Sequence, residues 1–420
     1  MIPINDLEEI NFDAVPVDPF WNLGEGKESS MHRIHAYPAK FPAFITTKAL
    51  DYARKHAINV VRMADIFCGC GTTAFEAKRC NIDFWGCDIN PVATMIAKVK
   101  SRKYQTKRLR KYYQNIVASF IKADKKTVHY EYANERLKYW YDPEHFEDLY
   151  RLKVAIEKST SNRGYYRLFF YCAFSNILKS TSRWLTKAIK PQVDPDKKPA
   201  DVLNVFKRQC EFMIRANEES DIEGFSEVKI STGNFLTYLN RPKVDMIVTS
   251  PPYVTSYEYA DLHQLSSLWL GFSEDYRQLR KGSIGSCYHT NNPKQEQKYL
   301  NATGRWIIQS LSKDYKSKVH AITKYFLDIQ KTAEYVYSML NDGGAALFVI
   351  GNTEYKGIKV DNARHLAESL RSAGFRKMCV TKRRISNKYF TPYRDKEGRF
   401  TRDSNSRKTY GEEFILIAEK

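Results

Sequence analysis

The chain has 420 residues and a formal net charge of +19 at pH 7, with 43% hydrophobic and 14% aromatic residues. This length and hydrophobic content allow two or three domains with cores of their own, which excludes a disordered chain. Because no stretch approaches the roughly 18 apolar residues of a membrane span and the acidic start does not resemble a signal peptide, we expect a cytoplasmic protein without membrane contact.

The first predicted elements alternate between strand and helix. An apolar run at residues 60–67 is followed by a glycine-rich turn, a helix-like segment at 72–80 and a second apolar run at 82–89. This order is typical of a βαβ unit. From residue 101 to 225 the pattern changes to long amphipathic stretches with few glycines, which predict helices.

Strand signals return near residue 226. Four apolar segments predict buried or half-buried strands, at residues 227–233, 244–250, 345–351 and 413–419. The helix-like stretch before Gly343 and Gly344 ends in a glycine pair that a helix C-cap would use. We therefore predict one α/β sheet interrupted by a helical insertion. The chain divides into an N-terminal half, an insertion and a C-terminal half, at residues 1–100, 101–225 and 226–420.

The basic residues are spread unevenly along the chain. Residues 1–30 hold seven acids and one base, whereas two long stretches are basic. One begins at Arg102 and continues through the aromatic-rich residues 163–190, and the other, from Arg376 to Lys408, holds twelve bases and three acids. Cations neutralise phosphates and aromatic rings stack on exposed bases, so both stretches are typical of a nucleic-acid surface. Solvated protein faces would show the same charge.

The glycine-rich turn reads DIFCGCGTT at Asp65–Thr73. Gly69 and Gly71 allow backbone amides to approach a ligand, and the helix that follows favours negative groups at its N-terminus. Asp88 ends the next strand, where a carboxylate can accept hydrogen bonds from ribose hydroxyls. The glycine turn and Asp88 together fit a nicotinamide dinucleotide as well as an adenosyl cofactor. Asp65 favours the adenosyl cofactor, because it is acidic where a cationic methionyl amine would lie.

A second motif, VTSPPY at Val248–Tyr253, directly follows an apolar strand. Pro251 and Pro252 donate no backbone hydrogen bond and restrict the chain, which predicts a stiff loop at the strand's carboxyl end. The Ser250 hydroxyl and the Pro251 carbonyl would accept the hydrogens of an exocyclic amine. Tyr253 would stack on a base that has left the duplex. A methyl group would then pass in line from a sulfonium, with catalysis mostly by positioning.

On FCGCG at Phe67–Gly71, on Asp88 and on TSPPY at Thr249–Tyr253, the chain resembles the amino-group DNA methyltransferases that use S-adenosylmethionine. The Ser-Pro-Pro-Tyr form resembles the subgroup that methylates cytosine at N4, whereas Asp-Pro-Pro-Tyr or Asn-Pro-Pro-Tyr is usual for adenine N6. The segment HAYPAKFP at His35–Pro42 is similar to the one that packs along the methionine moiety in this family. The resemblance implies a Rossmann-like methyltransferase sheet.

The resemblance also implies which residues act. Asn234 stands where the family has an acid near the adenine ring, and its amide oxygen can still accept a hydrogen bond. The implied catalytic residues are those of the proline loop, Ser250, Pro251, Pro252 and Tyr253. The implied cofactor neighbours are Lys40, Phe41, Pro42, Asp65, Phe67, Gly69, Gly71, Thr72, Thr73, Asp88, Ile89, Asn234 and Phe235. No metal is implied, and the eight cysteines form no CxxC pair.

The implied partner is DNA, in a restriction-modification or related defence system with a cognate nuclease where one exists; the oligomeric state stays open. The resemblance implies that residues 1–100 form the N-terminal segment and cofactor-binding half of the methyltransferase domain, and residues 226–420 its catalytic half. This motif order resembles that of enzymes with the target-recognition region between the two halves. We therefore expect residues 101–225, with the basic segment 271–320, to recognise and clamp DNA. In the competing interpretation 101–225 is a lid and the C-terminal basic run reads DNA.

Other interpretations stay open at this point. The substrate amine could be adenine N6 in DNA or a base in RNA, and the chain could be a nucleic-acid-binding module without catalysis. A nicotinamide oxidoreductase would require the proline loop to be incidental. We expect His263 and Cys70 to be structural, and Tyr257, Tyr259 and Asn352 are candidates for the base pocket.

Overall fold

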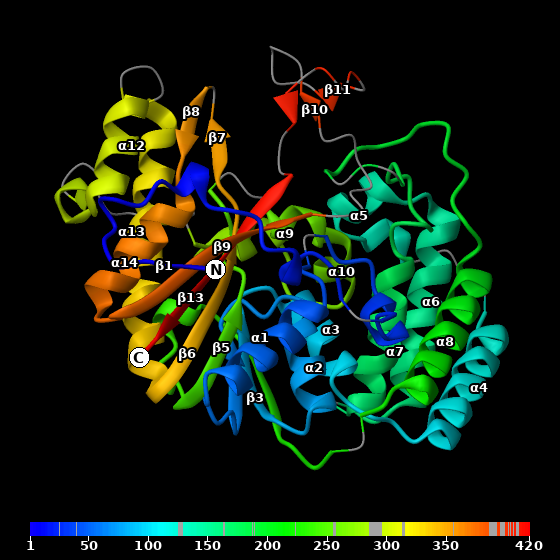
Figure 1. Cartoon of the computed structure of the whole chain (residues 1–420). Helices are drawn as coiled ribbons and strands as arrows, with labels where there is room; N and C mark the ends of the chain where they lie inside the picture. Colours follow the sequence, from blue (N-terminus) through cyan, green and yellow to red (C-terminus); the bar gives the residue numbers. More distant parts are fainter. Residues whose placement is uncertain are drawn as a thin grey trace.

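The structure is a computed structural model of the chain (Figure 1). It describes residues 1–420 apart from residues 25, 39, 125–128, 163, 187, 189, 223, 255–257, 285–295, 313–315, 356, 386–392, 395–399, 402, 404, 406, 409 and 410. Tyr257, a predicted pocket residue, and part of both the 271–320 segment and the C-terminal basic run therefore lie outside the described residues.

A central sheet with the strand order β1-β9-β13-β6-β5-β2-β3-β4 organises the molecule. The strands β4, β3, β2, β5 and β6 are parallel, and β13 is antiparallel to both of its neighbours, β6 and β9. Their bounds are β1 Ile2–Pro3, β2 Arg62–Asp65, β3 Asp83–Asp88, β4 Val228–Thr232, β5 Val244–Thr249, β6 Leu340–Ile350, β9 Lys377–Arg384 and β13 Glu412–Glu419. The predicted α/β class with a Rossmann-like sheet is confirmed.

Alternating side chains of the strands enter two hydrophobic cores, one on each face of the sheet. Met63 and Met246 pack with α1 (Phe44–Lys55) and α2 (Thr72–Arg79). Their neighbours Ala64 and Ile247 pack with α13 (Lys316–Met339) and α14 (Asn362–Ala373). Burial on both faces explains why these strands read as continuous apolar runs. Within the described part of the chain, no helix combines the length and apolar character that crossing a membrane requires.

The predicted helical insertion is confirmed, and it forms a separate lobe (Figure 1). The lobe has its own core, in which Trp140 and Trp184 stack with ring centroids 4.8 Å apart. Phe169, Phe170 and Phe174 are fully buried there. Its helices are α4 Thr106–Lys122, α5 Glu135–Trp140, α6 Pro143–Ser159, α7 Tyr165–Ile177 and α8 Val202–Glu219. Most of the aromatic residues interleaved with bases in this stretch thus build a core, which corrects their interpretation as stacking platforms. Tyr165, at the start of α7, is exposed.

The connection between the sheet and this lobe is α3 (Pro91–Lys100), which packs on α7. The proline loop leads into α9 (Tyr259–Leu262) and α10 (Gln264–Trp269), and Leu265 and Trp269 complete the core of the lobe. The lobe is therefore attached to both halves of the sheet domain.

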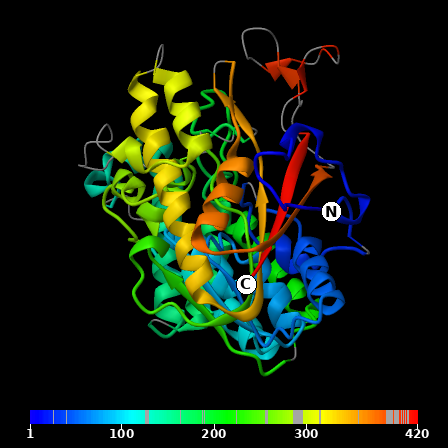
Figure 2. The ribbon, with the colours of Figure 1, turned by 60° about the vertical axis from the view of Figure 1, so that its left-hand side comes forward.

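The C-terminal basic run contains β9, which the sequence did not predict. Three of its bases are paired inside the sheet: Lys377 with Glu419, Lys382 with Glu412 and Arg383 with Glu413. These bases stabilise the sheet edge. Further along the run, β10 (Tyr393–Arg394), β11 (Phe400–Thr401) and β12 (Arg407–Lys408) form a small sheet that projects away from the main one (Figures 1 and 2).

The predicted C-cap at Gly343 and Gly344 is wrong. Helix α13 ends at Met339, and β6 begins at once with Leu340 opposite Val244. The register then shifts, so the glycine pair lies in an irregularity of the strand. Gly343 has a φ of +78°, which explains why glycine stands there.

Replacing two glycines by alanine measures how much close packing at the glycine turn contributes to the free energy of unfolding. Gly71 has a φ of +75°, and a Cβ there would lie 2.6 Å from Ala97 Cβ on α3. Gly343 has a similar φ with no atom within 4 Å of that position. We expect Gly343→Ala to lower the free energy of unfolding by about 1 kcal/mol from backbone strain alone. Gly71→Ala should cost at least about 2 kcal/mol more from overpacking. Equal losses in urea unfolding would contradict this account.

Candidate active site

The predicted functional residues meet at the carboxyl edge of the parallel strands. Asp65 ends β2, Asp88 ends β3, Asn234 follows β4 and Ser250 follows β5. The chain runs outward from β2 to β3 and β4 and then returns to β5 on the other side of β2. Ligands of open α/β sheets bind where the strand order reverses in this way.

Asp65 joins the two halves of the site. Its carboxylate accepts hydrogen bonds from Thr249 Oγ1 at the end of β5 (2.7 Å), from Thr73 Oγ1 in α2 (3.1 Å) and from the Phe67 amide (3.1 Å). The side chain is 1% exposed, and burial raises its pKa to about 7 against the hydrogen bonds that lower it. Asp65 therefore holds the glycine turn and the proline loop in register.

The glycine turn has the shape that the sequence predicts. Gly69 and Gly71 both have positive φ, at +46° and +75°, and Gly71 stands directly before α2. The Gly71 amide donates to the Cys68 carbonyl (2.7 Å), which closes the turn. Thr72 and Thr73 open the helix and are buried. The N-terminus of α2 thus faces the same edge as Asp65.

Asp88 is oriented by two backbone amides. One carboxylate oxygen accepts from Gly69 and the other from Asn90, both at 2.8 Å. Each oxygen keeps a second lone pair, so the half-buried carboxylate can still accept from a pair of ligand hydroxyls. Burial raises the pKa of Asp88 to about 6, while the two amides lower it.

Beside Asp88, the residues predicted to contact an adenine ring lie together. A Cβ placed on Gly282 would lie 3.3 Å from Ile89 Cδ1 and 3.5 Å from Asn234 Nδ2. The Asn234 side-chain oxygen accepts from the Leu236 amide (2.9 Å) and retains a lone pair. Phe235 is 3% exposed and packs edge-on against Phe67, so it supports this region from the core. Gly282 was not predicted, because nothing local marks it.

The HAYPAKFP segment lies against the glycine turn, as expected, but through a residue that was not singled out. The ring of Tyr37 lies 3.5 Å from the position of a Cβ on Gly69. It stacks with Tyr259 and with His263, at centroid distances of 6.0 Å and 5.1 Å. Burial and the Asp88 carboxylate raise the pKa of Tyr37 well above its usual value.

The predicted neighbours of the methionine moiety lie further along this segment. Lys40 donates to the His32 carbonyl (2.6 Å), and burial lowers its pKa. Phe41 is half-buried against the core around α1, and the Pro42 carbonyl accepts from the Ile45 amide (3.1 Å).

His263 and Asn352 have structural contacts. His263 is buried with Nδ1 2.8 Å from Asn90 Nδ2, and burial lowers its pKa to about 3, so it is neutral. Asn352 donates to Asp361 (2.8 Å) and accepts from the Ala363 amide (3.0 Å) at the start of α14. Its side chain thus fixes a helix end, which argues against a pocket role.

The proline loop is held from the antiparallel side of the sheet. The Tyr253 hydroxyl donates to Glu413 Oε1 (3.1 Å), and Arg383 Nε donates to Glu413 Oε2 (2.9 Å). A Cβ on Gly351 would lie 2.9 Å from the Tyr253 ring, so glycine at the end of β6 makes room for it. Burial and the Glu413 carboxylate raise the pKa of Tyr253. Pro251 is buried, and Pro252 is half-buried.

Sequence reasoning missed this support. Glu413 carries no motif. Arg383 belongs to RRIS, a stretch that resembles the family, but only the strand pairing of β9 with β13 places it opposite Glu413. Ser250 is half-buried beside Pro251 at the end of β5, and its hydroxyl forms a hydrogen bond with the side chain of Tyr253. Among the residues that the structure describes, no cluster of His, Cys, Asp and Glu is suited to a metal ion.

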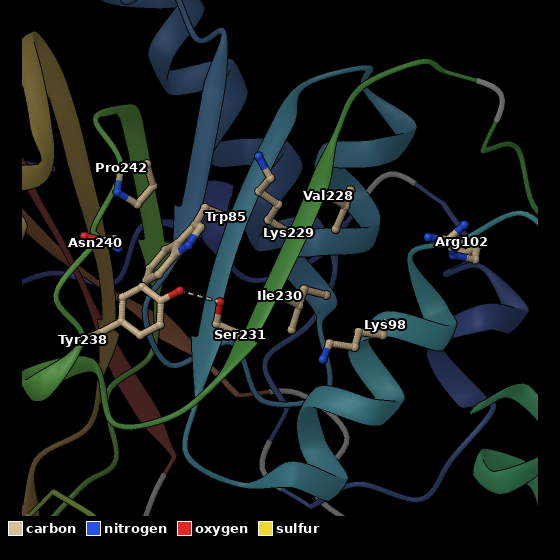
Figure 3. A pocket seen from close by; sticks show the side chains of 10 residues that line it. All are labelled: Trp85, Lys98, Arg102, Val228, Lys229, Ile230, Ser231, Tyr238, Asn240 and Pro242. Carbon is tan, nitrogen blue, oxygen red and sulfur yellow. Dashed lines mark hydrogen bonds between the residues drawn. The ribbon is translucent and has the colours of Figure 1, made fainter. Parts of the chain in front are cut away.

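One hollow on the surface lies away from this edge. A groove of about 520 Å³ runs along the sheet edge at β4 and contains none of the predicted site residues. Figure 3 shows Trp85 and Tyr238 at one side of β4 and Lys98 and Arg102 at the other. The candidate site at the carboxyl edge of the strands is therefore identified from the side chains that meet there, and not from a hollow in the surface.

The chain is similar to three Type II methyltransferases. It is 22% identical over 401 residues to M.MvaI of Kocuria varians, covering 87% of this chain and 86% of the relative. It is 23% identical over 371 residues to M.MjaII of Methanocaldococcus jannaschii, covering 66% and 68%. It is 26% identical over 264 residues to M.BsoBI of Geobacillus stearothermophilus, covering 56% and 52%.

No family model matches the chain. A solved rRNA methyltransferase, aviRa from Streptomyces viridochromogenes, aligns with 96% of both chains at 8% identity. Its TM-score of 0.31 is too low to carry any argument about this chain. The fold assignment therefore rests on the strand order and direction of the sheet itself.

The pKa of Asp65 predicts how stability changes with pH. The folded chain holds this proton up to about pH 7, whereas an unfolded aspartate loses it near pH 4. Because the folded state binds more protons in this window, the free energy of unfolding should fall as the pH rises from 4 to 7 and then level off. In Asp65→Asn this fall should be smaller, although Asp88 contributes in the same direction to both proteins. Urea unfolding at pH 5 and pH 8 measures the difference, and an unchanged pH dependence in the variant would contradict it.

Proposed function

We propose that this chain is a DNA methyltransferase that transfers a methyl group from S-adenosylmethionine to the exocyclic N4 amine of a flipped cytosine. The observation that carries the proposal is the convergence of Asp88, the glycine turn and Ser250 on one edge of the sheet, held together by Asp65. The similarity to Type II methyltransferases supports the same class of reaction.

The residues present fit S-adenosylmethionine. Asp88 keeps lone pairs for the ribose hydroxyls, Ile89 and Asn234 lie together beside it, and the positive-φ glycines leave the backbone open. When bound, this cofactor supplies an electrophilic methyl group on a sulfonium. Every other requirement of the reaction is one of position, which the protein meets with its own side chains.

The task of the proline loop is to hold the amine. Ser250 Oγ and the Pro251 carbonyl accept its two hydrogens, which turns the nitrogen lone pair away from the ring and toward the methyl group. The loop stays in place because Thr249, directly before it, is bonded to Asp65. Tyr253 offers its ring to the base, while Glu413 fixes its hydroxyl. The uncatalysed amine is a poor nucleophile, so this geometry supplies most of the rate.

Binding to DNA is supported by charge. The excess of bases gives a net charge of +19. Helix α4 lies at the outer side of the helical lobe (Figure 1), and its residues Lys107, Arg108 and Lys111 are exposed. We propose the insertion 101–225, with 271–320, as the target-recognition region. The small sheet β10–β12 is the competing candidate, and exchanging the insertion with that of a related enzyme decides between them. Unchanged sequence specificity in the chimera would favour the small sheet.

Three variants test the roles in the proline loop. Ser250→Ala should lower turnover roughly 100-fold, the usual cost of losing one positioned hydrogen-bonding group. Tyr253→Ala should also lose most activity, whereas Tyr253→Phe keeps the ring and should retain most of it. Transfer of labelled methyl groups to DNA measures turnover. Calorimetry with S-adenosylhomocysteine measures cofactor affinity, which we expect to be unchanged in all three. A loss of affinity equal to the loss of activity would contradict these roles.

A further inference from the structure

Behind the glycine turn lies a lysine whose charge is not compensated. Lys100, the last residue of α3, is 1% exposed. Its ammonium donates to Cys70 Sγ at 3.4 Å, and no ion pair to a carboxylate forms within the described part of the chain. Removing an ammonium from water without an anionic partner costs several kcal/mol. A thiol is a weak acceptor that uses one of the three donors, so two remain.

The neighbouring groups do not supply the missing negative charge. The buried carboxylate of Glu76 is already shared between His32 Nε2 (2.7 Å) and Arg79 Nη1 (2.8 Å). Lys40 is a second cation in this region, and the charge of Lys100 contributes to the lowering of its pKa. Two lysines thus create a positive potential between the HAYPAKFP segment and the turn. Such a potential is a site for an anion.

The position of Cys70 shows where that anion would lie. Cys70 stands between Gly69 and Gly71, so Lys100 is one side chain away from the backbone that would hold the cofactor. The methionine end of S-adenosylmethionine is expected on this side, against His35–Pro42. That end carries a carboxylate. Its negative charge would compensate the positive charge of Lys100. Its oxygens can accept hydrogen bonds from the two N–H groups of Lys100 that are not bonded to Cys70.

We infer that Lys100 is the buried cation that recognises the methionyl carboxylate of the cofactor from behind the glycine turn. The inference rests on the proposed function, because it assumes the same cofactor. Lys100 would then determine cofactor specificity, because it would let the enzyme discriminate S-adenosylmethionine from adenosyl ligands that lack the carboxylate.

The test compares two ligands and two lysines by calorimetry. The ligands are S-adenosylhomocysteine and its decarboxylated analogue, which lacks only the carboxylate. Lys100→Met should bind S-adenosylhomocysteine 10- to 100-fold more weakly than wild type, roughly the value of a hydrogen bond to a charged group. It should bind the analogue as wild type does. Lys98→Met is the matched control, because Lys98 is exposed on the same helix and should leave both affinities unchanged.

Two results would overturn the inference. One is an equal loss for both ligands in Lys100→Met, which would indicate a purely structural role. The other is wild-type protein that binds both ligands equally well, which needs no variant and holds even if Lys100→Met fails to fold. If wild-type protein binds neither ligand, the proposed function itself fails, and this outcome is distinct from the first two.

Discussion

The hydrogen bond between Thr249 and Asp65 is the contact on which the site depends. It crosses the point where the strand order reverses, so it joins the end of β2 to the end of β5 although 184 residues separate the two side chains. On one side of it lie the glycine turn and Asp88, which we propose as a cradle for an adenosyl group. On the other side the proline loop presents Ser250. A group-transfer enzyme needs these two parts at a fixed distance, and a buried carboxylate with three donors provides that constraint.

The sequence was sufficient for the parts of the fold that local patterns determine. The strands near residues 62, 83, 244, 345 and 413 are apolar because both faces of the sheet are covered, whereas the edge strand near residue 228 is only half-buried. The βαβ order follows directly. The glycine turn and the proline loop were located because glycine and proline restrict the backbone in ways that a sequence reveals. Asp65 and Asp88 were found because each ends a parallel strand.

The structural features that could not be predicted from the sequence depend on contacts between distant segments. Strand β9 was hidden in a basic run, because its lysines and arginine pair with acids on β13. The same pairing places Glu413 and Arg383 behind Tyr253. Tyr37 and Gly282 reach the cradle only through tertiary packing. The aromatic residues of α7 were read as a nucleic-acid surface, since composition does not tell a buried face from an exposed one.

The identity of the methylated base tests the account most directly. DNA incubated with the protein and S-adenosylmethionine would be hydrolysed to nucleosides, and the methylated nucleoside identified by mass spectrometry. The account predicts N4-methylcytosine, formed by wild-type protein and nearly absent with Ser250→Ala. Recovery of N6-methyladenine alone would contradict the assignment to cytosine, and recovery of no methylated base would contradict the proposed activity.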